Sequence, residues 1–167
     1  ARKSNTTSSF ETVKMLLDSG ANIELKNNCG NTALLASIKN LNKTSNVETV
    51  KFLLDRGANV NVKNYKNETA LLYTIILADI INSIELVNLM LDKGVDVNLN
   101  CVQNASPLMI ATPVVTTRTI DVVKLLLDNG ANINFKNYNT SALTIAIDHE
   151  NSFVRTEVVK LLITYNP

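Results

Sequence analysis

Apolar residues recur along the chain in short blocks with helical spacing. Val13, Leu16 and Leu17 lie at positions i, i+3 and i+4, which places them on one face of a helix. The same block returns three more times. Each copy is followed by a glycine able to take the left-handed conformation that ends a helix: Gly20, Gly57, Gly94 and Gly130. The steps between these glycines are 37, 37 and 36 residues, so the chain contains an internal repeat.

A second apolar block runs in phase with the first and predicts another helix in each repeat. Its starts carry hydroxyl side chains that can cap free backbone N–H groups, at Thr32, Thr69, Ser106 and Ser141. Between glycine and cap, the segment 59–64 alternates polar and apolar residues, which predicts the extended half of a hairpin-like finger. Two residues before each cap we expect a positive φ, at Gly30, Asn67, Asn104 and Asn139.

The helix start Thr32-Ala33-Leu34-Leu35 and the closure Leu-Leu-Asp-x-Gly-Ala-Asn, repeated in register, resemble the ankyrin repeat family over residues 8–167. The resemblance implies an all-α fold, a helix–turn–helix solenoid with short β-hairpin-like fingers. We expect a single domain over 1–167, part of a longer repeat protein. Its boundaries are predicted as a partial unit 1–26 followed by units 27–63, 64–100, 101–136 and 137–167.

Two features depart from the family pattern. The repeats are longer than the usual length of about 33 residues, and the extra residues fall between the helices, which predicts longer helices or a longer turn there. The family's histidine near the start of the first helix is replaced in every copy, by Leu35, Leu72, Met109 and Thr144. Because these side chains cannot tie neighbouring fingers by its hydrogen bonds, we expect more of the stack to depend on apolar packing.

Composition narrows the class of protein. A hydrophobic share of 46% argues against disorder, and a net charge of +1 provides no attraction to nucleic acid or to an anionic membrane. No apolar run reaches the roughly 18 residues of a membrane span. Cys29 and Cys101 predict reduced thiols in a cytoplasmic protein. The 24 asparagines suggest an AT-rich genome, as in some viruses and intracellular pathogens, which would place the chain in a host cytosol; we attach no mechanism to them.

No residue pattern predicts catalysis, a cofactor or a metal site. His149 is the only histidine, and we expect it on the surface, because no second ligand stands at metal-binding spacing. Asp18, Asp55, Asp92 and Asp128 recur at the same place in each repeat, which indicates a structural role because a catalytic site occurs once.

The family resemblance implies a non-enzymatic module that binds a protein partner on its concave face, formed by finger tips and the exposed side of each first helix. The implied partner-binding residues are Tyr65, Lys66, Glu68, Ile76, Leu77, Val102, Gln103, Val114 and Tyr138. For Ile76, Leu77 and Val114 the alternative is the core of lengthened helices. We expect a monomer without nucleic-acid or membrane binding, and read the finger lysines Lys26, Lys63, Lys66 and Lys136 as a solvated edge. The alternative function is a structural spacer or targeting domain attached to a catalytic or effector region elsewhere.

One modification pattern is present. Asn61, Asn98 and Asn134 each follow a leucine or methionine of the second helix by eight residues, which resembles the ankyrin pattern modified by asparaginyl hydroxylases. The alternative is a structural asparagine that bonds to its own turn.

Overall fold

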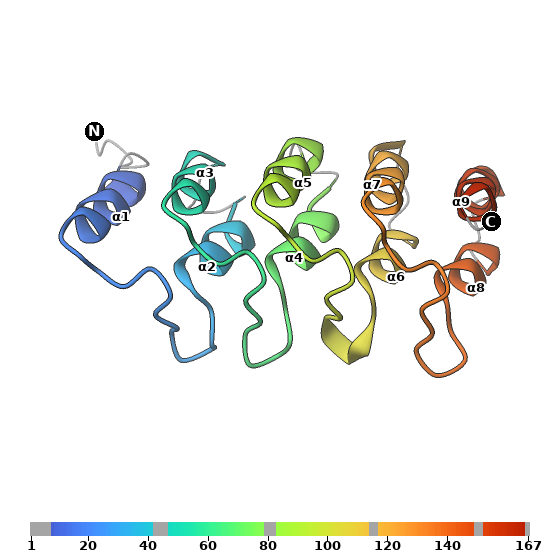
Figure 1. Ribbon diagram of the computed structural model, residues 1–167, viewed down its shortest axis with the longest axis horizontal. Helices are drawn as coiled ribbons and strands as arrows, with labels where there is room; N and C mark the ends of the chain where they lie inside the picture. The colour runs from blue at the N-terminus through green and yellow to red at the C-terminus, as the bar shows by residue number, and fades with distance from the viewer. Residues whose placement is uncertain (1–7, 42–46, 79–82, 114–116, 149–151, 166–167) are drawn as a thin grey trace, which may run out of the picture. The chain divides into compact units, whose positions relative to one another are not determined.

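The computed structural model describes residues 8–41, 47–78, 83–113, 117–148 and 152–165 (Figure 1). Within these ranges the regular elements are helical, and the chain forms two compact units, Ala1–Ala70 and Leu71–Pro167. The first helices of the repeats are α2 (Ala33–Lys39), α4 (Ala70–Ile76), α6 (Pro107–Ala111) and α8 (Ala142–Ile147). The second helices are α1 (Ser8–Asp18), α3 (Val47–Asp55), α5 (Ser83–Asp92), α7 (Thr117–Asp128) and α9 (Ser152–Thr164).

The predicted caps start the first helices. The hydroxyl of Thr32 accepts the N–H of Leu35 at 3.4 Å, and that of Ser106 accepts the N–H of Met109 at 3.2 Å. Ser141 and Thr144 form a reciprocal capping box. Each cap satisfies a backbone donor that the first turn leaves open, which stabilises such a helix by about 1 kcal/mol.

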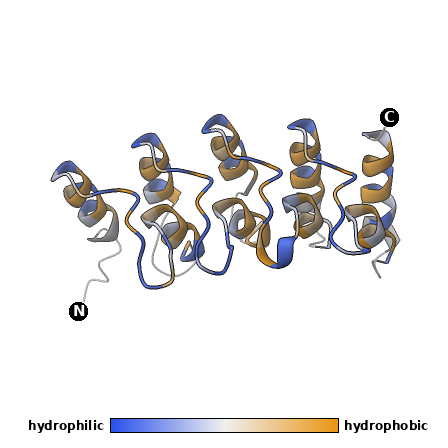
Figure 2. Cartoon of the chain, turned by 60° about the horizontal axis from the view of Figure 1, so that its bottom comes forward, coloured by the Kyte–Doolittle hydropathy of each residue, from blue (hydrophilic) through white to orange (hydrophobic). Residues whose placement is uncertain are grey.

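Apolar side chains of paired helices form the core of each unit. In the first unit α2 packs against α3, and Leu34, Ile38, Val50 and Leu53 are buried between them. In the second unit α6 packs against α7, where Leu108, Val123 and Leu126 are buried. The helix α8 packs against α9, where Ala142, Ala146 and Leu162 are buried but Ile147 is exposed. Figure 2 shows the helices mainly apolar and the connecting loops mainly hydrophilic. Each fully buried Leu or Ile contributes about 1.5–3 kcal/mol.

At the position where the family has a histidine, three of the four repeats have a buried apolar side chain. Leu35, Leu72 and Met109 are all buried, which agrees with the expected reliance on apolar packing. Thr144 is exposed and instead caps its own helix.

The first helices are not lengthened. They end at Lys39, Ile76, Ala111 and Ile147, so the extra residues of each repeat follow the first helix rather than extend it. Much of the stretch in which we expected the extra residues lies outside the described residues, at 42–46, 79–82, 114–116 and 149–151.

The finger after each second helix begins with a glycine of positive φ, for example 85° at Gly57 and 77° at Gly94, as predicted. The segment 59–64, however, is not the extended half of a hairpin. The Asn59 side chain accepts the N–H of Asn61 at 2.9 Å and closes a turn there. The same bond forms in the other fingers from Asn22, Asp96 and Asn132. The alternation therefore reflects turn-closing side chains, and the asparagines at these positions have a structural role that genome composition does not explain.

The finger tips use left-handed residues at three of the four predicted positions: Gly30, Asn67 and Asn104, with φ of 78°, 59° and 57°. In the fourth finger the prediction for Asn139 is wrong, because the positive φ of 53° falls on Tyr138. That finger is one residue shorter from glycine to cap. Asn137 and Thr140 consequently pair directly through two backbone hydrogen bonds, the one isolated β-bridge within the described ranges, and close a tighter turn.

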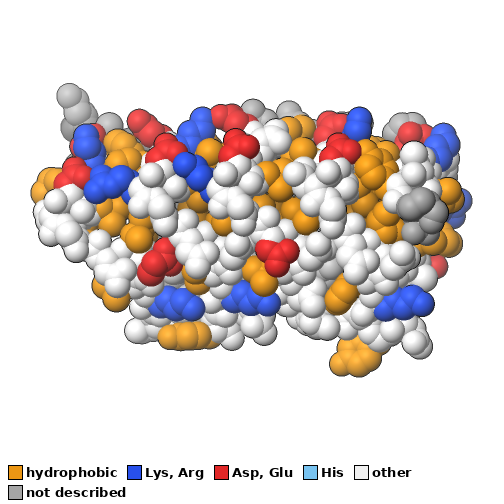
Figure 3. All heavy atoms as spheres, viewed as in Figure 1, with side chains coloured by type: hydrophobic (Ala, Val, Ile, Leu, Met, Phe, Trp, Pro, Cys, Tyr) orange, Lys and Arg blue, Asp and Glu red, His pale blue; other side chains and the backbone are white. Residues whose placement is uncertain are grey.

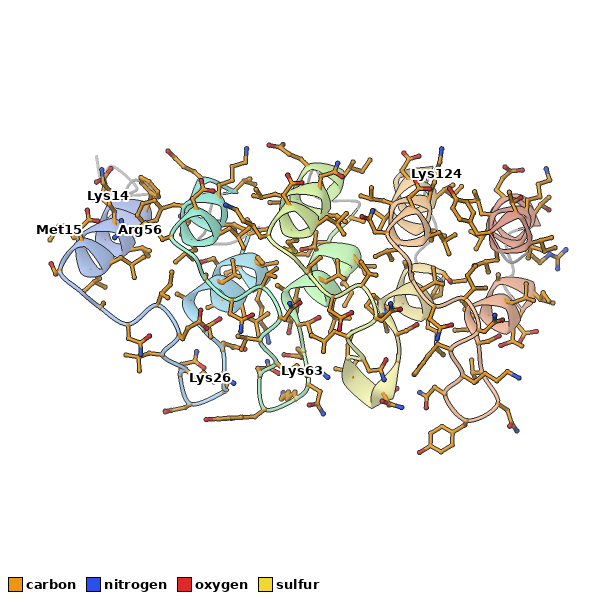
Figure 4. The ribbon with its side chains drawn as sticks, viewed as in Figure 1. Lys14, Met15, Lys26, Arg56, Lys63 and Lys124 are labelled. Carbon is orange, nitrogen blue, oxygen red and sulfur yellow. The ribbon has the colours of Figure 1, made fainter. Side chains whose placement is uncertain are left out.

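Side chains also join successive repeats within each unit. Asp18 at the end of α1 accepts a hydrogen bond from Arg56, which follows α3, at 2.6 Å (Figure 4). Asp128 at the end of α7 accepts one from Tyr165, which follows α9. Arg56 and Tyr165 occupy the same place in their repeats. Two of the four recurring aspartates thus bond to the following repeat, which gives them the structural role that their periodicity indicates.

Candidate functional site

One position at or just after the end of each first helix is exposed in all four repeats. It lies seven residues after the capping residue and holds Lys39, Ile76, Pro113 and Asp148. We call these four residues the outer helix positions. Ile76 is 49% exposed and Leu77 beside it is half-buried, so Ile76 does not belong to the core of a lengthened helix. Val114 lies outside the described residues.

The finger tips expose most of the other predicted residues. Tyr65 is 72% exposed and Tyr138 94% exposed, while Lys66 and Gln103 are also open and Val102 is half-buried. Two tyrosines so open to water are available for contact with a partner.

Tyr65 is exposed but held in place. Its backbone N–H donates to the Cys29 carbonyl at 3.3 Å. Its ring lies on Gly30 so closely that a Cβ added to Gly30 would stand 2.8 Å from ring atoms Cγ and Cδ1. The ring therefore rests against the neighbouring finger, and its orientation needs no partner to fix it.

Glu68 is used within its own unit. Its carboxylate accepts the Asn64 side-chain amide at 2.6 Å and forms an ion pair with Lys39 at 3.4 Å. Asn64 also donates to the side chain of Asn31 at 2.8 Å, which joins the two fingers of the first unit. This amide contact supplies a tie between fingers that the family's histidine normally makes.

The third finger is built differently because Cys101 replaces the asparagine found at the base of the other fingers. Asn27 and Asn64 accept N–H groups of their own tips through their side chains. The buried Cys101 instead directly precedes a short three-ten turn, Val102–Asn104, in which Gln103 takes φ 53° and ψ 27°. The Gln103 carbonyl accepts the Asn137 side chain of the next finger at 2.6 Å.

The described members of the predicted set fall into two groups. Tyr65, Lys66 and Glu68 belong to the first unit; Ile76, Leu77, Val102, Gln103 and Tyr138 belong to the second. Sequence reasoning missed the half-buried residues four positions after each cap, Tyr73, Ile110 and Ile145 in the second unit. Their signal is helical spacing, since they stand one turn before the outer helix positions.

Asn98, a hydroxylation candidate, has structural contacts. Its amide donates to the Gly130 carbonyl at 3.0 Å and accepts the N–H of Asn132 at 2.8 Å. Asn98 therefore holds two points of the next finger. This favours a structural role for Asn98, made through the next finger and not through the bond to its own turn that the alternative describes.

Groups that could perform chemistry are few among the described residues. Within the described ranges no cluster of His, Cys, Asp and Glu could hold a metal ion, and Cys29 and Cys101 are both free thiols. His149 lies outside the described residues. The Tyr165 pKa is raised above its ordinary value, chiefly by the hydrogen bond to Asp128, but this contact joins two helices. No described helix has the length and apolar character required to cross a membrane.

Short first helices, longer second helices and turn-rich fingers, repeated at 36–37 residues, define a helical repeat protein. A family model of ankyrin repeats, in three copies, matches residues 3–101 and 75–167. The chain belongs to the ankyrin repeat family, whose members are generally protein–protein interaction modules. A search of curated proteins finds no match.

Proposed function

We propose that this chain is a non-enzymatic module that binds a protein partner through the exposed side of its first helices. One observation carries the proposal. The outer helix positions are open in all four repeats, yet their side chains differ in kind: Lys39, Ile76, Pro113 and Asp148. Other positions of the first helices vary less, and the position two residues after each cap holds leucine in every repeat, at Leu34, Leu71, Leu108 and Leu143. Variation at an open position on a less variable framework is what a surface shaped for a partner requires.

The second unit offers the apolar part of this surface. Ile76 and Pro113 are exposed on α4 and just after α6, and Ile110 and Ile145 stand half-buried one turn earlier on α6 and α8. The helices α6 and α8 contact each other. An apolar centre next to a charged residue such as Asp148 has the composition of a protein interface with a polar rim.

The family resemblance would make this side of the helices the concave face and would add the finger tips to it. We further propose a cytoplasmic monomer, which size-exclusion chromatography and cell fractionation test. The competing function, a spacer or targeting domain, predicts that no partner contacts the outer helix positions.

A photo-crosslinking amino acid at position 76 tests the proposal in an extract of the source cells. It should yield a covalent adduct with a discrete protein. Ile163 provides the matched control, because it is an exposed aliphatic residue (63%) on the second helix α9. The adduct should be absent when the crosslinker stands at position 163.

A point variant then tests the energetics. Ile76→Asp should weaken capture of the crosslinked partner by about 2 kcal/mol, the usual cost of removing a central anchor. Ile163→Asp should leave capture unchanged, and both variants should keep the helical circular dichroism signal. Equal adducts from both positions, or unaltered capture by Ile76→Asp, would show that the first helices are not the binding surface.

A further inference from the structure

The fingers of the first unit carry a concentration of positive charge. Lys26 belongs to the finger between α1 and α2, and Lys63 and Lys66 belong to the finger between α3 and α4. The two fingers of the second unit contain a single lysine, Lys136. Figure 3 shows basic side chains over the fingers of the first unit, and Figure 4 places Lys26 and Lys63 on neighbouring fingers.

The acidic residues of these fingers bond to groups other than the three lysines. Glu24 accepts the backbone N–H of Asn59 at 2.7 Å, and Glu68 bonds to Asn64 and Lys39. Within the described part of the chain, Lys26, Lys63 and Lys66 form no ion pair. The Lys26 ammonium group donates to the Lys63 carbonyl at 3.0 Å, which holds these two residues together.

An ordered aromatic ring adjoins the lysines. Tyr65 stands between Asn64 and Lys66, is 72% exposed, and is fixed by its contacts with Cys29 and Gly30. A rigid tyrosine costs little conformational entropy when a partner covers it, which is why such residues often dominate binding energy.

We propose that Lys26, Lys63, Lys66 and Tyr65, here called the basic finger cluster, bind an acidic segment of a protein. Carboxylates of the segment would meet the three ammonium groups, and an apolar side chain beside them would lie on the Tyr65 ring. Charge complementarity selects this ligand. The basic finger cluster shares no residue with the outer helix positions. The inference rests on the proposed function in one respect only, that the partner is a protein.

A protein segment fits this surface better than a nucleic acid. Binding of single strands uses successive aromatic side chains on which bases stack along a basic groove. The basic finger cluster has one such ring, and the net charge of the whole chain is only +1.

The test uses the protein as it is and a short fluorescein-labelled peptide of alternating glutamate and serine with one central leucine. Fluorescence anisotropy should show binding that weakens as salt rises from about 50 to 200 mM. A peptide with glutamine in place of glutamate should bind at least about tenfold more weakly. No detectable binding of the acidic peptide at about 1 mM would overturn the proposal.

Variants locate the binding. Lys63→Glu with Lys66→Glu should weaken the acidic peptide at least about tenfold, and Tyr65→Ala should do so by a similar factor while Tyr65→Phe retains most binding. The matched control is Lys14→Glu with Lys124→Glu, which makes the same change in net charge on α1 and α7, where both lysines are exposed (Figure 4).

Equal loss in the control and finger variants would mean that only overall charge matters, and would overturn the assignment. Tighter binding of an oligouridine than of the acidic peptide, lost in the finger variant, would also overturn it in favour of nucleic acid. Ile76→Asp should not alter peptide binding, so failure of the basic finger cluster is distinguishable from failure of the helix surface.

Discussion

Gly30 should be the least replaceable glycine of the first unit, because two separate constraints act on it. Its φ of 78° lies in the left-handed region, and a Cβ there would stand 2.7 Å from the backbone nitrogen of Tyr65 and 2.8 Å from two ring atoms. Gly57 shares the first constraint, with φ 85°, but a Cβ added to it would meet no atom within 4 Å. The two glycines therefore form a matched pair.

The magnitudes follow from this difference. Alanine in the left-handed region costs about 1–2 kcal/mol, which is the whole expected effect of Gly57→Ala. Overpacking against atoms that cannot move freely adds about 1–3 kcal/mol. The backbone nitrogen of Tyr65 is such an atom, since its N–H is bonded to Cys29. Gly30→Ala should thus lower the free energy of unfolding by about 2–5 kcal/mol.

Urea unfolding followed by far-ultraviolet circular dichroism measures both variants. Adding Tyr65→Ala to Gly30→Ala should recover part of the loss, because the ring contact disappears while the backbone contact stays. The same destabilisation in Gly30→Ala and Gly57→Ala would refute the claim that the Tyr65 finger packs against Gly30.

Three further predictions concern ties between repeats. Arg56→Gln should lower the free energy of unfolding by at most about 1 kcal/mol, because the pair with Asp18 is partly exposed, and the difference should vanish in high salt. Asn98→Ala should cost about 1–2 kcal/mol in urea unfolding through loss of its two bonds, and mass spectrometry after treatment with an asparaginyl hydroxylase should show no oxygen added to Asn98 in the folded protein. The raised Tyr165 pKa means that folding favours the neutral phenol; its stabilisation is present below the unfolded pKa of about 10 and lost as pH rises through the higher folded value. When tyrosinate absorbance is followed as pH rises, the wild type should therefore show one tyrosine that ionises at higher pH than the others. Tyr165→Phe should lack this group.

The sequence was sufficient for the helices and their caps because their signals are local and occur several times in register. Ser106 and Ser141 each accept the N–H three residues ahead, as their positions predict. The fingers were harder. Polar–apolar alternation at 59–64 looked like a strand, but in the structure Asn59 closes a turn with its own side chain. Periodicity does not distinguish a polar residue that faces water from one that bonds to the backbone.

The candidate site was less predictable still. Exposure of Tyr65 was expected from its place at a finger tip, and Tyr65 is exposed. For Ile76 the sequence left open whether it is exposed or lies in the core of a lengthened helix, and the structure has it 49% exposed. The bonds of the Glu68 carboxylate to Lys39 and Asn64 could not be predicted from the sequence, because these side chains lie 29 and 4 residues away along the chain. The tie between Asp18 and Arg56 had a signal: the two residues are separated by 38 positions, close to one repeat length.

A comparison of Lys39 with Ile76 suggests a variant that separates partner binding from folding stability. Lys39 occupies in the first complete repeat the position that Ile76 occupies in the second, and both are exposed at the end of a short helix. The fold therefore accepts a lysine at this position. Ile76→Lys should leave the urea midpoint nearly unchanged, because a side chain already 49% exposed loses little burial. The same change should place a charge in the apolar part of the proposed interface and sharply weaken the partner captured through position 76. A large fall in stability would instead mean that Ile76 supports the core and that the open outer position is not free for a partner.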